Sequence, residues 1–201
     1  MNQRVALVLM GAWLAGTVCM SVVATENFYT IDRLLAGSPN AAFAAAVERL
    51  GQPQARELLR YLSSELNRLY FQLWNVAQLA IGVVVLWLLA GSGKRDQADA
   101  QTEDPGDRRR LGPFGPAVWG VVAMLASVVL MLVWLTPAIV SLGRSLDFVP
   151  RDPPPPGMQR FWVLHAAYTS LEMIKLVAGI VVTVWIARPP RMHESGNRVI
   201  E

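Results

Sequence analysis

The sequence predicts an all-α fold: a four-helix transmembrane bundle with a helical extramembrane hairpin between the first and second spans. Three observations lead to this prediction. Of the 201 residues, 53% are hydrophobic and 16% are charged, whereas soluble domains carry roughly 25% charged residues. The mean hydropathy is positive, at +0.35. Apolar stretches recur along the chain, each of the roughly 20 residues that are needed to cross a bilayer.

The whole chain is predicted to be a single integral membrane domain. Inside a bilayer each span must satisfy its own backbone polar groups, so we expect helices. The predicted spans cover residues 5–23, 70–90, 117–136 and 161–187. Tryptophan is enriched at both membrane–water interfaces. Five tryptophans lie near the ends of the predicted spans: Trp87, Trp119, Trp134, Trp162 and Trp185.

The first span has two interpretations. Arg4 before a hydrophobic run and small residues at 22–24 after it resemble a secretory signal peptide. The run of about 19 residues is longer than the roughly 7–15 of such a peptide. Gly11 and Gly16 also give the run a small-residue face suited to close helix packing. We favour an uncleaved helix and keep the cleaved signal as the alternative.

Residues 38–69 are predicted to form the extramembrane helical hairpin. Ser38, followed by a proline, is a candidate N-cap, and Gly51 is a candidate stop. A second helix should begin near Pro53. Leucines recur at spacings of three and four over residues 56–69, so this helix should continue into the second span.

The other connections differ in composition. Residues 91–113 begin with two glycines and are rich in charge, which predicts that the helix ends there and that a flexible loop follows. The proline run at 153–156 predicts a stiff, extended connector. Pro137 should kink the third helix near its exit, and the helix can continue beyond it to Ser145.

Basic residues predict the orientation. Four spans place both termini and the loop at 91–113 on one side, with about half of the Lys and Arg residues, including the cluster Arg108, Arg109 and Arg110. On the other side, most basic residues lie in the long first loop beside acidic ones. We therefore expect both termini in the cytoplasm of a bacterial inner membrane. Because basic and acidic residues are interleaved, we expect no nucleic-acid partner.

The fourth span carries an unusual polar stripe. A charge at the centre of a span costs about 2.5–3.5 kcal/mol on insertion scales, so two charges three residues apart are expected to offset each other's desolvation. At 100° per residue, the polar residues of this span fall within about 120° of one face. They are His165, Tyr168, Thr169, Glu172, Lys175 and Thr183.

The second span offers a counterpart to this stripe. Arg68, Gln72, Asn75 and Gln78 follow one another at spacings of three and four. We therefore predict that the second helix packs against the fourth and gives Glu172 and Lys175 amide partners. The combined face is either a structural polar clamp that orients the helices or a pathway for a proton, ion or small solute. We favour the clamp, because a single Glu–Lys pair lacks the several acidic groups of a proton relay.

Other chemistry finds little support in the sequence. His165 could ligate a haem, which would make the protein a cofactor-carrying electron-transfer subunit, but the other histidine, His193, lies in the polar tail. Cys19 is the chain's one cysteine, which excludes an intrachain disulfide and a multi-cysteine metal site. The sequence has no phosphate-binding glycine loop, metal-spaced His/Glu set or plausible catalytic triad. We expect no cofactor, no metal and no enzymatic activity, and as partners a larger membrane complex or a second copy of the chain.

Short segments in order along the chain resemble a known family. They are GAWLAG at 11–16, LNRLYF at 66–71, TPAI at 136–139 and FWVLH at 161–165. The chain resembles small four-helix bacterial membrane proteins of unknown function, related to a eukaryotic cisplatin-resistance-associated transmembrane protein and loosely to copper-resistance membrane domains. In this family the position near Glu172 is commonly an amide, so the chain departs from its pattern. The resemblance implies a membrane bundle without catalytic residues to transfer.

Overall fold

The computed structural model describes residues 2–37, 40–100 and 115–188, which are almost entirely helical and contain no strand. This confirms the predicted all-α class. The elements, in chain order, are α1 (Asn2–Gly37), α2 (Ala41–Leu50), α3 (Gln52–Ala100), α4 (Pro116–Leu130), the π-helical turn η2 (Met131–Leu135), α5 (Thr136–Ser145) and α6 (Met158–Ala187). His193, the Arg108–Arg110 cluster and the later part of the predicted loop at 91–113 lie outside the described residues.

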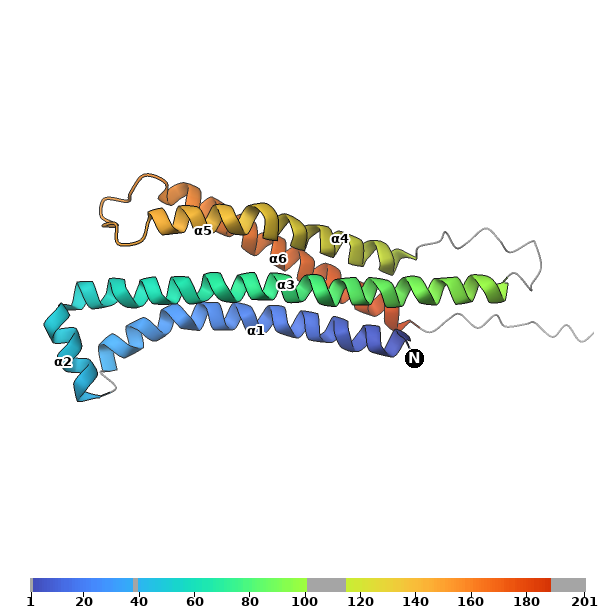
Figure 1. The fold of residues 1–201 in the computed structure, drawn as a ribbon, viewed down its shortest axis with the longest axis horizontal. Coiled ribbons are helices and arrows are strands. Elements are labelled where there is room, and N and C mark those ends of the chain that lie inside the picture. Colours follow the sequence, from blue (N-terminus) through green and yellow to red (C-terminus); the bar gives the residue numbers. More distant parts are fainter. Residues whose placement is uncertain (1, 38–39, 101–114, 189–201) are drawn as a thin grey trace, which may run out of the picture.

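Four helical rods are long and apolar enough to cross a membrane: Asn2–Gly37, Gln52–Gly91, Pro116–Ser145 and Met158–Ala187. This confirms the predicted four-span layout. The rods run along one long axis, with the N-terminus, the start of α4 and the end of α6 at one end (Figure 1). The helix α2 and the loop between α5 and α6 lie at the other end, which we call the loop end.

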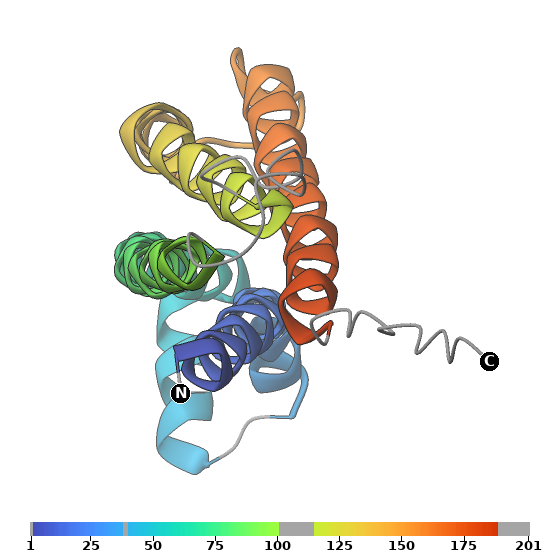
Figure 2. The ribbon, with the colours of Figure 1, turned by 90° about the vertical axis from the view of Figure 1, so that its right-hand side faces the viewer.

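Neighbours in the bundle differ from those we predicted. Both α1 and α4 pack against α3 and against α6, so α3 and α6 occupy opposite corners (Figure 2). The prediction that the second span packs directly on the fourth was therefore wrong. Close approach is set by glycines on other pairs of helices, because Gly179 of α6 faces Leu14 of α1 and Gly120 of α4 faces Val182 of α6.

The rods extend well beyond the predicted spans at the loop end. At about 1.5 Å per residue, the 36 residues of α1 measure about 54 Å, against roughly 30 Å for the hydrocarbon core. The predicted hairpin is helical within the described residues, where it consists of the short α2 and the first third of α3. The helical extension of α1 packs on this part of α3 through Ile31, Leu35 and Ala55.

The start of α2 differs by two residues from the predicted one. The cap is Asn40, whose side-chain oxygen accepts a 2.8 Å hydrogen bond from the Phe43 amide. An asparagine cap satisfies one of the unpaired amides of the first turn as well as a serine would. At the other end, Gly51 stops the helix as predicted: its φ is +81°, and its amide donates to the Val47 carbonyl at 2.9 Å.

The helix α3 passes through Gly91 and Gly93 and ends at Ala100, so the predicted stop at these glycines was wrong. A glycine inside a helix costs only about 1 kcal/mol relative to alanine. The residues that follow, Lys94–Ala100, include lysine, arginine, glutamine and alanine, all of which are good helix formers. Two glycines without a proline therefore do not end a helix that is already long.

The third rod passes Pro137 by way of the π-helical turn η2 (Met131–Leu135). The Thr136 amide donates to the Met131 carbonyl, five residues earlier, which widens the helix by one residue. Proline lacks an amide hydrogen and its ring collides with the carbonyl of the preceding turn. The structure thus has a π-helical turn just before Pro137, where a kink was predicted, and α5 continues to Ser145, as expected.

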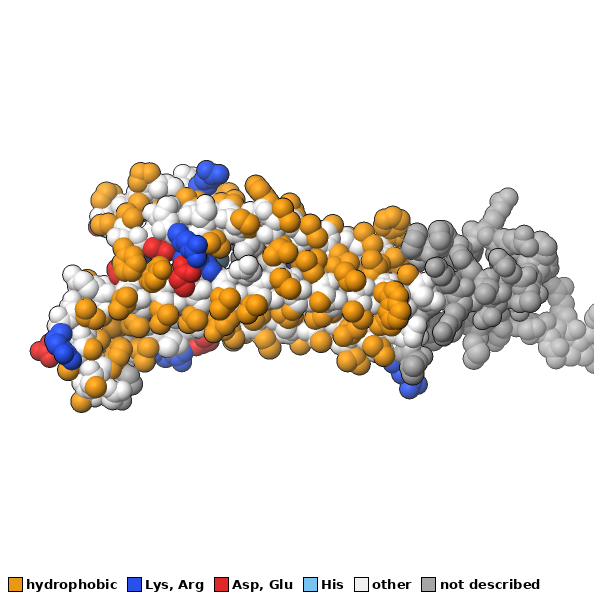
Figure 3. All heavy atoms as spheres, viewed as in Figure 1, with side chains coloured by type: hydrophobic (Ala, Val, Ile, Leu, Met, Phe, Trp, Pro, Cys, Tyr) orange, Lys and Arg blue, Asp and Glu red, His pale blue; other side chains and the backbone are white. Residues whose placement is uncertain are grey.

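The outer surface of the rods is apolar. Hydrophobic side chains cover much of the half that lies toward the N-terminus, whereas acidic and basic groups gather toward the loop end (Figure 3). The five tryptophans that were assigned to the interface all point outward, and Trp87 is the most exposed of them, at 73%. Such a surface fits lipid, and the four apolar helices fit an integral membrane protein.

The core is centred on α1, which supplies Met10 and Trp13, both buried. Around them pack buried aliphatic and methionine side chains of the other three rods, among them Val85, Val121 and Val182. Of the two glycines noted in the first span, Gly16 lies directly against the ring of Trp74, whereas Gly11 has no neighbour within 4 Å of a built Cβ. The predicted small-residue face is therefore used at Gly16 and not at Gly11.

This contrast gives a matched test of helix packing. We expect Gly16→Leu to destabilise the bundle by about 1–3 kcal/mol, the usual cost of overpacking a well-packed site, because the new side chain would overlap the Trp74 ring. Gly11→Leu adds the same side chain in open space and should leave stability near that of the wild type. Thermal unfolding in detergent checks both variants, and equal melting temperatures would contradict the packing described here.

Candidate functional site

Some residues of the predicted polar face are buried in the bundle and others are exposed. On α3, Asn75 and Gln78 are completely buried, and on α6, Tyr168 and Lys175 are buried and Glu172 is nearly so. His165 and Thr169 are exposed. The hydroxyls of Thr169 and Thr183 donate to carbonyls one turn earlier in their own helix, His165 and Gly179 respectively. The stripe of six residues is thus reduced to three that face the interior.

A polar core joins all four rods at one level. The Trp13 indole donates to Gln78 Oε1 at 2.8 Å, and the Gln78 amide donates to Asn75 Oδ1 at 3.5 Å. Asn75 Oδ1 also accepts from the Tyr168 hydroxyl at 3.5 Å, and Asn75 Nδ2 donates to Thr136 Oγ1 at 3.3 Å. We call these five residues the polar core. They come from α1, α3, α5 and α6, so one network links every rod.

Two members of the polar core were missed in the sequence. Trp13 lies in the middle of the first span, whereas tryptophans favour the membrane interface at span ends. This central position was the sequence signal that could have indicated a buried hydrogen-bonding role. Thr136 was seen only as the residue before Pro137. Nothing in its spacing indicates that it would meet Asn75, because the contact depends on how the third rod packs.

The Glu172–Lys175 pair forms as predicted, with 2.9 Å between Lys175 Nζ and Glu172 Oε1. The Lys175 side chain is 1% exposed and that of Glu172 is 12% exposed. Lys175 Nζ also lies 3.7 Å from the Met131 sulfur, in the π-helical turn. Because neighbouring opposite charges reduce each other's cost of burial, the pair can stay in the apolar interior.

The amides of α3 do not bind this pair, contrary to the prediction. The Gln78 oxygen accepts from Trp13 and its nitrogen donates to Asn75, so its bonding capacity is directed away from Glu172. Within the described residues, Glu172 Oε2 is buried and has no hydrogen-bond partner. The diagonal placement of α3 and α6 explains why the long side chain of Tyr168 spans the gap.

His165 is exposed near the start of α6 and lines a cavity to which Tyr168 also contributes. Its ring stacks on Phe161, with 6.0 Å between ring centroids, and meets the edge of Trp162 at 6.1 Å. No group of three His, Cys, Asp or Glu side chains suited to a metal ion occurs among the described residues.

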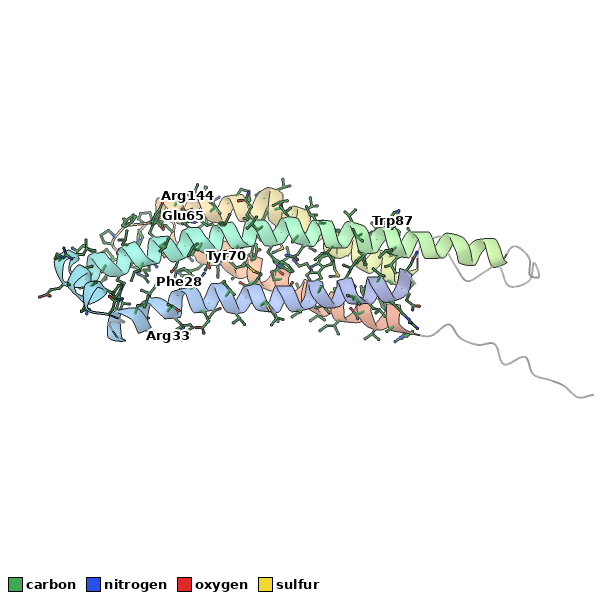
Figure 4. All side chains as sticks on the ribbon, turned by 60° about the horizontal axis from the view of Figure 1, so that its bottom comes forward. Phe28, Arg33, Glu65, Tyr70, Trp87 and Arg144 are labelled. Atoms are coloured by element: carbon green, nitrogen blue, oxygen red, sulfur yellow. The ribbon has the colours of Figure 1, made fainter. Side chains whose placement is uncertain are left out.

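A second charged cluster lies at the loop end. The Arg68 side chain is largely buried and pairs with Glu65 and with Asp147, the latter at 2.9 Å. Arg144 of α5 reaches the same Glu65 at 3.1 Å (Figure 4). Arg68 was placed on the polar face in the sequence, but Asp147 was not, because it lies 79 residues away in the turn after α5. The cluster fastens α3 to the third rod outside the predicted span.

Comparison with known proteins identifies no relative. No protein-family model, curated protein or solved structure matches the chain.

The Trp13–Gln78 hydrogen bond can be measured by a double-mutant cycle. We expect the double variant Trp13→Phe with Gln78→Leu to lose less free energy of unfolding than the sum of the losses in the two single variants. The difference should be about 0.6–1.7 kcal/mol, the range found for hydrogen bonds between membrane helices. Ser127→Ala serves as the control, because its exposed hydroxyl bonds only to the Ala123 carbonyl. It should be additive with Trp13→Phe. Additivity of Trp13→Phe with Gln78→Leu would contradict the bond.

Proposed function

We propose that this protein is a non-enzymatic accessory component of a bacterial inner membrane, with both termini in the cytoplasm, and that its buried polar residues are a structural clamp. One observation carries the proposal: the polar core bonds to itself across all four rods. Amides that served a solute would need free donors or acceptors, whereas these are directed at one another. The clamp then fixes the register of the helices.

The ion pair fits the same role. Lys175 is enclosed by Glu172 and by the π-helical turn at Met131, so it links α6 to the third rod. Glu172 and Lys175 are the charged side chains in the middle of the described spans, and no second carboxylate lies beside them to relay a proton. A rigid bundle with wide apolar faces is suited to association within the bilayer, either with a larger complex or with a second copy.

The second candidate function is a small transporter or channel that uses the Glu172–Lys175 face. The observation in its favour is Glu172 Oε2, a buried oxygen that has no hydrogen-bond partner among the described residues. An unsatisfied carboxylate oxygen is a place where a proton or a water could bind. In this case Glu172→Gln should abolish flux in proteoliposomes, even when the reconstituted variant is shown to be folded.

The contribution of the ion pair to stability is tested by thermal unfolding. We expect Lys175→Met alone to destabilise the bundle strongly, by about 3–5 kcal/mol, because it leaves the Glu172 charge buried without a partner. The double change Glu172→Gln with Lys175→Met removes both charges and should recover most of that loss. Thermal unfolding in detergent checks the order, with Thr169→Val on the exposed side of α6 as a control. A double variant as unstable as Lys175→Met would contradict the clamp.

The accessory role is tested by extraction from native membranes in mild detergent. We expect recovery in stoichiometric amount with a larger membrane complex, or as a defined homo-oligomer, by size-exclusion chromatography with mass spectrometry of the fraction. The double variant should assemble as the wild type does, since the proposed role needs the fold and not the charges. Recovery of the wild type as a monomer would overturn the accessory role and leave the flux assay to decide the second candidate.

A further inference from the structure

A cavity of about 450 Å³ lies at the loop end, between α1, α3, α5, α6 and the loop that follows α5. This volume falls within the roughly 300–1,000 Å³ that is usual for small-molecule sites. Figure 4 labels Phe28, one of its lining residues, on α1 near Glu65 and Arg144. The polar core ends at this cavity, because Tyr168 and Thr136 contribute to its inner wall.

The lining has two chemically distinct parts. The inner part is aromatic and aliphatic and includes Phe71, Ile139 and Val140. The outer part carries three arginines from two segments, Arg60 and Arg68 on α3 and Arg151 in the loop, and one carboxylate, Asp147, which pairs with Arg68. An apolar interior with basic groups at one end is the arrangement expected for a molecule that has a hydrocarbon part and an anionic head.

The three arginines differ in how their charge is balanced. Arg68 is paired with Glu65 and Asp147, and Arg60 is paired with Glu57 at 3.0 Å. Arg151 makes no ion pair with any described residue, and it is exposed at the mouth of the cavity. It is therefore the guanidinium that is free to receive an anion.

The surroundings of Arg151 already disfavour its positive charge. Partial burial and the nearby Arg60 guanidinium lower the pKa of Arg151 from its usual value, although Glu57 and Asp147 act in the opposite direction. An anion bound between Arg60 and Arg151 would be attracted to both. Guanidinium groups bind carboxylates and phosphates through parallel hydrogen bonds, and such charge-assisted bonds are stronger than neutral ones.

The cavity also crosses the predicted membrane boundary. The second span is predicted to begin at Tyr70, so Phe71 lies inside the hydrocarbon region. Arg60 lies eleven residues before Phe71 on the same helix, about 16 Å away along its axis. The inner part therefore lies at the predicted edge of the hydrocarbon region, since Ile139 and Val140 come just after the third span, and a head group at Arg60 and Arg151 would lie farther toward the aqueous surface.

We propose that this cavity binds a single-chain anionic amphiphile, with its carboxylate or phosphate head at Arg151 and Arg60 and its hydrocarbon chain against Phe71, Ile139 and Val140. The proposal goes beyond the accessory role and does not depend on it. Free inorganic phosphate would leave the apolar wall unused. A neutral lipid would leave Arg151 unused.

The binding test uses the full chain in nanodiscs of zwitterionic phosphatidylcholine. The probe is radiolabelled dodecyl phosphate, and retention by protein-free nanodiscs is subtracted. We expect saturable binding that unlabelled dodecyl phosphate displaces and that equal concentrations of inorganic phosphate or dodecanol do not. Absence of saturable binding would overturn the proposal. Displacement by inorganic phosphate as effective as that by dodecyl phosphate would also overturn it, since the site would then be an anion site alone.

Two pairs of variants locate the site. Arg151→Gln should weaken binding about tenfold, as expected for the loss of one charge-assisted contact. Arg160→Gln, an exposed arginine outside the cavity lining, should leave binding unchanged. Val140→Trp should fill the inner part and abolish binding, whereas Val133→Trp places the same ring on the exposed outer face of the third rod.

Folding of each variant is checked by its melting temperature in the absence of probe. Arg151 makes no ion pair among the described residues and Val133 faces outward, so Arg151→Gln and Val133→Trp should melt with the wild type. If Val140→Trp fails to fold, the arginine pair alone decides. Equal binding by Arg151→Gln and Arg160→Gln in folded protein would overturn the proposed position of the head group.

Discussion

Buried amide and hydroxyl groups at the centre of an apolar bundle must bond to one another, because neither lipid nor water is there to replace a missing partner. The structure of this chain depends on how it meets that requirement. Asn75 and Gln78 are completely buried on α3, and each would be costly on an isolated span. Trp13, Thr136 and Tyr168 supply their partners from the three other rods. A change in the register of any rod would break at least one of these bonds.

This requirement also explains features that otherwise look unrelated. The π-helical turn before Pro137 places Met131 beside Lys175 and brings Thr136 to Asn75. The glycines at 16, 120 and 179 let neighbouring rods approach closely enough for side-chain bonds to form across the centre. The helix α6 approaches α5 at the loop end and α1 at the other end, so one helix carries Tyr168 toward the amides and Lys175 toward the third rod (Figure 2).

The two ends of the bundle differ in what they can do. Toward the chain termini the interior is filled by Met10, Trp13, Val121 and Met124, which leaves a tightly packed apolar core. Toward the loop end the rods enclose a cavity whose arginines come from α3 and from the loop after α5. The Arg68–Asp147 and Arg144–Glu65 pairs hold these two segments together. Because Arg68 is paired with Asp147, its charge is balanced within the protein. This leaves Arg151 as the cation open to a ligand.

The sequence by itself determined the class of the protein, the four spans and the helical hairpin. These follow from the length and hydropathy of each segment, which can be read without knowing its neighbours. About 20 apolar residues can cross a bilayer only as a helix or in a closed barrel. It also identified Asn75, Gln78, Tyr168, Glu172 and Lys175 as the polar residues that needed an explanation, because a polar group in an apolar span is costly unless it finds a partner. The Glu172–Lys175 pair was predictable since its members lie three residues apart on one helix.

Which rods are neighbours was decided only by the tertiary structure. The placement of α3 and α6 at opposite corners reflects glycine contacts between α1 and α6 and between α4 and α6, and no local pattern encodes such pairings. For the same reason Trp13 and Thr136 could not be assigned to Asn75 and Gln78, nor Asp147 to Arg68, from spacing alone. Hydrogen bonds between residues more than 60 positions apart depend on the relative height and rotation of whole helices, and packing sets both.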